Sequence, residues 1–154
     1  MNSILKVAFL GVYALASSLA IADQSARTAS DLDLKVAYCA AASSKQLGTM
    51  LALQVALPAN APPDQRAGVQ KTIQGLSSDL SSFRSYLQTK QSDLDSTALA
   101  KEKQLAEADV DVGMKVVHEC GISSGGAPML MSTCVAGSPE ASRVRSCKGA
   151  TFLH

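Results

Sequence analysis

The sequence feature that most constrains the fold is a run of apolar residues at heptad spacing in the middle of the chain. Six residues follow one another at intervals of 4, 3, 4, 3 and 4 positions: Val69, Ile73, Leu76, Leu80, Phe83 and Leu87. This is the a/d spacing of a coiled-coil-like helix that buries one stripe against other helices. We expect this seam to lie in the core of a bundle within the chain. A homodimer formed through the same six residues is the alternative.

A second helical pattern occupies residues 31–56. Ser30 precedes it and can cap its first turn, and Asp33 completes a capping box three residues later. The pattern ends at Leu57, because Pro58 lacks an amide donor and its ring clashes with the preceding helical turn. The segment PANAPPDQ that follows is predicted to be a connecting loop.

A third helical pattern runs from about residue 94 to residue 120. Its apolar residues share one predicted helix face, which we expect to be the buried one: Leu94, Ala98, Leu105, Ala108, Val112 and Val116. Asp109 and Asp111 are two positions apart, so they diverge on a helix and are better explained by a solvated face than by paired acid/base catalysis. Gly121 is expected to end this helix in the left-handed conformation.

The connections between these patterns are polar or rich in small residues. TKQSDLDST predicts a break between the second and third helices, although one long bent helix over residues 64–120 also fits the pattern. Residues 121–137 carry little helical pattern. Ser138 then offers an N-cap and Pro139 stands at the first helical position, which predicts a short fourth helix.

These patterns together predict an all-α fold. The expected helices cover residues 31–56, 64–90, 94–120 and 139–147, and sustained period-two alternation, which is typical of strands, is absent. Three long helices of similar length with short connections favour an antiparallel up-down-up three-helix bundle. The short fourth helix belongs to a disulfide-stapled C-terminal tail.

The beginning of the chain predicts export. Lys6 supplies a positive charge, an uncharged apolar run follows, and Ala20 and Ala22 place small residues where signal peptidase reads. The run over residues 7–22 is 16 residues long, shorter than the roughly 20 that cross a bilayer. We expect residues 1–22 to be a cleaved signal peptide and residues 23–154 to be a single helical domain, periplasmic or secreted.

The charge balance after cleavage narrows the class of partner. Loss of Lys6 from the 14 basic residues leaves 13, against 13 acidic residues, so the mature chain is formally neutral. Nucleic acid and anionic membranes both favour a basic excess, so neither is expected as the main partner. No later apolar run reaches membrane length, so we expect no membrane insertion after cleavage and a protein partner instead.

The four cysteines of the chain are Cys39, Cys120, Cys134 and Cys147. An even number in an exported chain favours two disulfides. In an up-down-up bundle the first and third helices run in parallel, which places Cys39 and Cys120 about 25 Å apart in height. A disulfide needs Cα atoms within about 7 Å, so we expect Cys39 to pair with Cys134 or Cys147. This argument fails if the second and third helices are continuous.

Other reactive residues give weaker patterns. His118, Glu119 and Cys120 are adjacent, so on a helix they cannot all face one metal ion. Met129, Met131 and Cys134, with His118 nearby, form a soft-ligand set that suits Cu(I), provided that Cys134 is free. The segment SSGG at residues 123–126 lacks the preceding strand and the lysine of a phosphate loop, so we expect a flexible linker.

These observations predict an exported, non-enzymatic protein with a binding or envelope-associated role and no cofactor. His118 and the terminal His154 are the only imidazole bases, and neither stands in a catalytic pattern. The serine-rich flank of the second helix is the expected partner surface: Ser77, Ser78, Ser81, Ser82 and Ser85. A periplasmic copper carrier that uses the Met129, Met131 and Cys134 set is the alternative.

Overall fold

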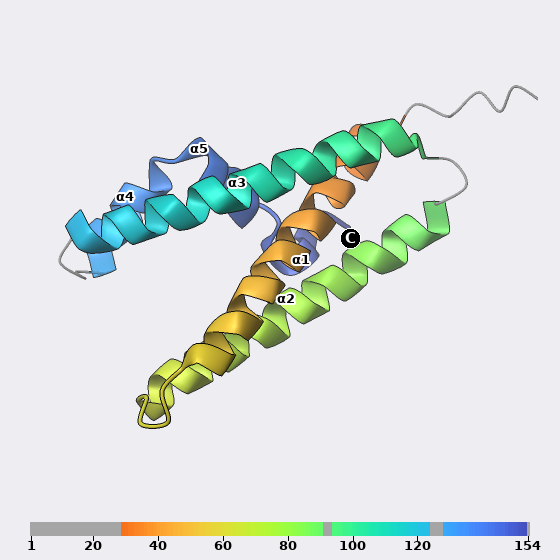
Figure 1. Ribbon diagram of the computed structural model, residues 1–154. Helices are drawn as coiled ribbons and strands as arrows, with labels where there is room; N and C mark the ends of the chain where they lie inside the picture. Colours follow the sequence, from red (N-terminus) through yellow and green to blue (C-terminus); the bar gives the residue numbers. More distant parts are fainter. Residues whose placement is uncertain (1–28, 91–93, 124–127, 154) are drawn as a thin grey trace, which may run out of the picture.

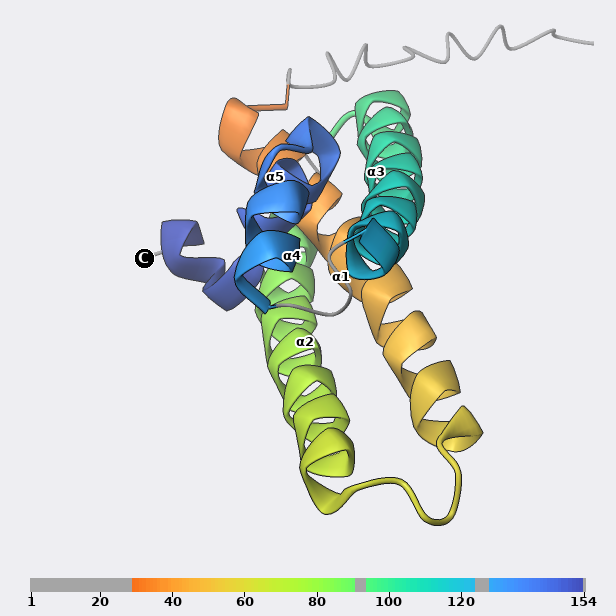
Figure 2. The same ribbon diagram turned by 90° about the vertical axis from the view of Figure 1, so that its left-hand side faces the viewer.

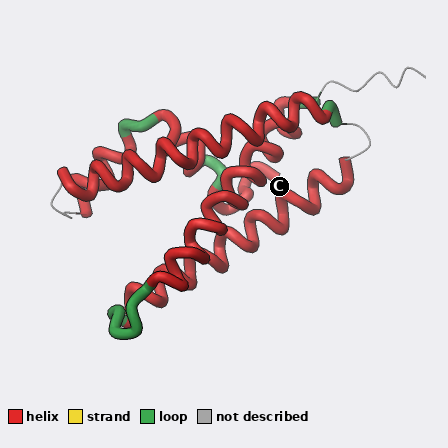
Figure 3. The backbone as a smooth tube through the Cα atoms, viewed as in Figure 1, coloured by secondary structure: helices red, strands yellow, loops and turns green. Residues whose placement is uncertain are grey.

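The computed structural model describes residues 29–90, 94–123 and 128–153, and within these ranges the regular secondary structure is helical throughout (Figures 1 and 3). The elements in chain order are α1 (Asp31–Ala56), α2 (Pro63–Lys90), α3 (Ser96–Ser123), α4 (Pro128–Ala136), α5 (Pro139–Arg145) and the 3-10 helix η1 (Lys148–Leu153). The all-α prediction is therefore confirmed. None of the helices in the described ranges is both long and apolar enough to span a membrane. The predicted signal peptide lies outside the described residues.

Helices α1 and α2 form an antiparallel pair (Figure 2). Helix α1 begins with the predicted capping box, in which the Ser30 hydroxyl accepts from the Asp33 amide at 3.2 Å and the Asp33 carboxylate accepts from the Ser30 amide at 2.9 Å. The loop that follows α1 is bonded to α2, because the Arg66 guanidinium of α2 donates to the carbonyl oxygens of Pro58 and Ala59, each at 2.7 Å. These bonds hold the turn between the two helices.

The heptad seam of α2 packs inside the chain. Ile73, Leu80 and Phe83 are buried, and the other three seam residues are half-buried. Phe83 is completely buried in the main core, where its ring stacks on that of Phe152 with centroids 5.7 Å apart. The seam therefore contributes to the core of the bundle, as the spacing predicts. Whether the chain also dimerises stays a prediction.

Helix α3 is separate from α2, because α2 ends at Lys90 and α3 begins at Ser96. The alternative of one continuous helix is therefore wrong. Helix α3 turns back and packs on α1, while it diverges from α2 (Figure 1). The three helices thus run up, down and up, with α1 between the other two.

The buried face of α3 differs from the predicted one. Leu105 and Val112, which were expected in the core, are each 42% exposed. The buried residues are instead Ala106, Asp109, Val110, Gly113 and Cys120. Helix α3 is apolar on more than one side, and its orientation is set by contacts with α1 and with the tail.

Two further details of α3 require correction. Asp109 was expected on a solvated face, but it is 3% exposed, because it pairs with an arginine from the tail. Gly121 was expected to cap the helix, but α3 continues through it to Ser123. The glycine with positive φ in the described chain is Gly149, at φ 80°, in the turn of η1.

The tail is more helical than the sequence pattern predicts. Helix α4 lies in the segment where little helical structure was expected, because PMLMSTCVA is apolar without periodicity. Helix α5 begins as predicted, with Ser138 as N-cap and Pro139 in the first turn, and ends at Arg145. Helices α4 and α5 pack along α3, and η1 reaches α2.

Two disulfides fix the tail, Cys39–Cys147 and Cys120–Cys134. The first joins the first half of α1 to Cys147, which lies between α5 and η1, 108 residues later, and the second joins the end of α3 to α4. Both the expected number of bridges and the pairing of Cys39 with the tail are confirmed.

Candidate functional site

A polar cluster joins α1, α3 and α5, in which Tyr38 and Asp109 are buried and the Arg143 side chain is 47% exposed. The Arg143 guanidinium donates from Nε to Asp109 Oδ2 and from Nη2 to Oδ1, both at 2.7 Å, and the Tyr38 hydroxyl donates to Oδ2 at 2.7 Å. The hydrogen bonds from Arg143, chiefly, hold the pKa of Asp109 below its ordinary value. Burial and the neighbouring carboxylate raise the pKa of Tyr38. These hydrogen bonds connect α5 of the tail to α1 and α3.

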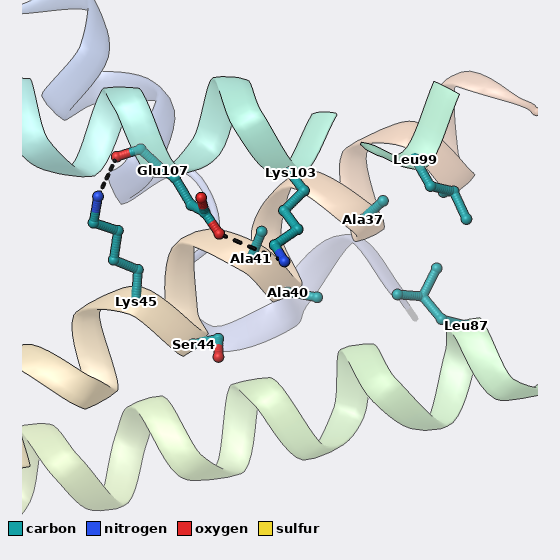
Figure 4. A pocket seen from close by; sticks show the side chains of 9 residues that line it. All are labelled: Ala37, Ala40, Ala41, Ser44, Lys45, Leu87, Leu99, Lys103 and Glu107. Atoms are coloured by element: carbon teal, nitrogen blue, oxygen red, sulfur yellow. Dashed lines mark hydrogen bonds and ion pairs between the residues drawn. The ribbon is translucent and has the colours of Figure 1, made fainter. Parts of the chain in front are cut away.

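A groove opens where α2 and α3 diverge, with α1 as its floor (Figure 4). We call it the alanine groove, with a volume of about 550 Å³ and the following lining residues: Ala37, Ala40, Ala41, Ser44, Lys45, Leu87, Leu99, Lys103 and Glu107. Ala37, Ala40, Ala41 and Ser44 follow the spacing i, i+3, i+4 and i+7, which places them on one face of α1. The floor of the groove is therefore made of small side chains.

The walls of the alanine groove combine apolar and charged residues. Leu87 of α2 and Leu99 of α3 project toward each other at one end (Figure 4). At the other end, Lys45 Nζ donates to the Glu107 carbonyl oxygen at 3.0 Å. Lys103 and Glu107 form an ion pair at 3.8 Å on the rim, where their side chains are 67% and 44% exposed. The groove thus has an apolar interior and a charged edge.

A second groove lies between α1, α2 and the tail, and we call it the cationic groove. Its volume is about 610 Å³, and its lining residues are Ser43, Gln46, Met50, Lys71, Thr72, Gln74, Gly75, Leu76, Asp79, Val144, Arg145, Cys147 and Lys148. Three of these residues carry positive charge and one carries negative charge. The two grooves share no lining residue.

The structure bears on the copper hypothesis, because all four cysteines are in disulfides. Cys134 is bonded to Cys120, so the soft-ligand set of the copper hypothesis lacks its thiolate. The side chains of Met129 and Met131 lie outside the described residues, and His118 is exposed on α3. Three or more metal-binding side chains do not cluster anywhere in the part of the chain that the structure describes. Residues 124–126 of the predicted linker also lie outside it, and Ser123 is the last residue of α3.

The serine-rich flank of α2 borders a third, smaller groove of about 440 Å³. Ser77, Ser81 and Ser85 line it together with Arg84 and, from α1, Leu47. Sequence reasoning found this surface but missed the two larger grooves. The alanine spacing on α1 was a readable signal for the first groove. The cationic groove had none, because its residues come from three distant segments.

No protein-family model, curated protein or solved structure proved similar to this chain.

Proposed function

We propose that this protein is an exported, non-catalytic binding protein that receives an amphipathic helix of a partner protein in the alanine groove. The carrying observation is the small-residue floor of α1 between two diverging helices. Small side chains on a helix face allow a second helix to approach closely, since the interaxial distance depends on the residues at the contact. Recognition of this kind places apolar anchors of the partner helix in a groove.

The dimensions and edges of the groove suit a short helical segment. From Ala37 to Ser44 the floor extends about 10 Å, at 1.5 Å per residue, which accommodates roughly two helical turns. Leu87 and Leu99 supply apolar contact on the two walls. The Lys103–Glu107 pair on the rim is exposed and therefore weak, so either charge is available to a partner's polar face.

Export is supported by the predicted signal peptide and by the two disulfides, which are typical of oxidising compartments. The test is the intact mass of the protein from its native compartment, with thiol alkylation before and after reduction. We expect a chain that begins at Asp23 and alkylates only after reduction. A chain that retains residues 1–22, or that carries free thiols when isolated, would contradict export in this form.

Partner binding is tested by a photo-crosslinking residue at Ser44, which lies exposed in the alanine groove. The matched control is the same residue at Ser78, which is exposed on α2 and lines none of the described grooves. In producing cells, position 44 is expected to crosslink to one protein, at a peptide with helical apolar spacing. Ala41→Leu, which fills the floor, should abolish that product while the circular dichroism spectrum is retained.

Two results would oppose this proposal. Equal crosslinking from positions 44 and 78 would show that contact is not specific to the groove. Crosslinking from position 44 that persists in the folded Ala41→Leu variant would show that the partner does not enter the floor.

A further inference from the structure

The geometry points to a second binding site: we propose that the cationic groove holds a single-chain anionic amphiphile, of the class of a medium-chain carboxylate. This proposal is independent of the helical partner, because the two grooves have different lining residues. It depends on an apolar wall, an unneutralised positive charge and the way in which the tail closes the groove.

The apolar wall is supplied by three elements. Met50 comes from α1, Leu76 from α2 and Val144 from α5. Val144 is 8% exposed, and Met50 and Leu76 are half-buried, so each presents part of its surface to the groove. A volume of about 610 Å³ lies within the roughly 300–1,000 Å³ that is usual for small-ligand sites. The groove can therefore accept an apolar chain and remove it from water.

The positive charge of the groove is not balanced from within. Lys71 and Lys148 form no ion pair with any residue that the structure describes, and Arg145 donates only to the carbonyl oxygens of Ala141 and Val135. The one acidic lining residue, Asp79, accepts a hydrogen bond from the Gly149 amide at 3.0 Å. Ammonium and guanidinium groups form strong charge-assisted hydrogen bonds with carboxylates. An anionic head group therefore complements this groove better than a neutral or cationic one.

The tail builds one side of the site. Cys147 lines the groove and is bonded to Cys39, which ties its neighbours Arg145 and Lys148 to the groove that Lys71 of α2 also lines. The three cations come from α2, α5 and η1, so they converge only once the tail has packed against α2. A simple inorganic anion would use the charges but not the apolar wall, whereas an amphiphile uses both.

The test is titration of the full mature protein with decanoate below its critical micelle concentration, followed by isothermal calorimetry and by the NMR signal of the Met50 methyl group. 1-Decanol, which has the same chain without the charge, and acetate, which has the charge without the chain, are the comparison ligands. We expect decanoate to bind once per chain and to shift the Met50 signal, and both comparison ligands to bind at least roughly tenfold more weakly.

The matched variants reverse one charge each. Lys71→Glu and Lys148→Glu are expected to weaken decanoate binding by roughly tenfold. Lys101→Glu makes the same charge change at an exposed position of α3 outside the groove, and its affinity is expected to stay within about twofold of wild type. Circular dichroism and complete oxidation of the cysteines show that each variant is folded.

Four outcomes would overturn the proposal. These are absence of decanoate binding by the wild type, equal binding of 1-decanol, equal binding of acetate, and equal loss of affinity in Lys101→Glu and the groove variants. The second would indicate non-specific apolar contact, and the third would indicate a simple anion site.

Discussion

Asp109 is the residue that connects three helices through one carboxylate. It is 3% exposed and accepts hydrogen bonds from Arg143 of α5 and Tyr38 of α1. Burial of an unpaired carboxylate would be strongly unfavourable, so its position in the core depends on these donors. Placement of the tail on α3 and the charge state of Asp109 are therefore coupled.

This coupling predicts acid sensitivity. The pKa of Asp109 lies below its ordinary value of 3.8 in the folded protein, so the unfolded chain binds the proton more readily. The stability that this carboxylate contributes is present above about pH 4 and is lost as the pH falls through the folded-state pKa. Urea unfolding from pH 2 to pH 7 should show this loss.

The Asp109→Asn variant is expected to lower the free energy of unfolding by about 2–3 kcal/mol at pH 7. Its stability should also depend less on pH than that of wild type. Asp111→Asn is the matched control, because the Asp111 side chain is 67% exposed and pairs with Lys45 at the surface. Similar acid profiles for wild type and Asp109→Asn would contradict the assigned role.

At the scale of elements, α3 and α5 come close together at Gly113. A Cβ atom at Gly113 would lie 3.7 Å from the Ala141 Cα and 3.9 Å from the Ala141 Cβ, which is ordinary van der Waals contact. The site therefore has room for one methyl group but not for a large side chain. Gly113 also lowers the helix propensity of α3.

Gly113→Ala is expected to stabilise the protein by roughly 0.5–1 kcal/mol, since alanine is the better helix former and its methyl group fits. Gly68→Ala on α2 is the control for propensity alone, because nothing lies within 4 Å of its added Cβ. Gly113→Leu should instead destabilise by displacing α5. If Gly113→Ala destabilises while Gly68→Ala stabilises, the α3–α5 contact is tighter than these distances imply.

At the scale of the whole molecule, the two disulfides differ in the length of the loop that each closes and in the elements that each connects. Cys39–Cys147 spans 108 positions and attaches the end of the tail to the core, whereas Cys120–Cys134 spans 14 and joins neighbouring elements. In the chain-entropy model the longer loop contributes about 4–5 kcal/mol and the shorter about 3 kcal/mol.

We therefore expect the double variant Cys39→Ala/Cys147→Ala to lose more unfolding free energy than Cys120→Ala/Cys134→Ala, by about 1–2 kcal/mol. Trypsin should also cleave the first variant faster after Arg145 and Lys148, because the tail is no longer held on α1. Equal stability losses and equal cleavage rates in the two double variants would contradict this ranking.

Sequence signals predicted the helices accurately where the signal depends only on residues close together in the chain. The capping box at Ser30, the stop at Leu57 and the seam of α2 all appear in the structure as the pattern implies. Helix α4 was missed because its apolar residues have no periodicity to indicate a face, and its position depends on the bond from Cys134 to α3.

By itself, the sequence determined the three long helices, the loop between the first two and the use of four cysteines in two bridges, because caps, prolines and periodicity act along the chain. Tertiary structure alone decided which face of α3 is buried. Leu105 and Val112 are apolar enough for the core, but the face that is buried is the one on which Asp109 can pair with Arg143. It also decided which tail cysteine bonds to Cys39 and where the two grooves form. Each of these outcomes depends on residues far apart in the chain that meet only after the helices have packed.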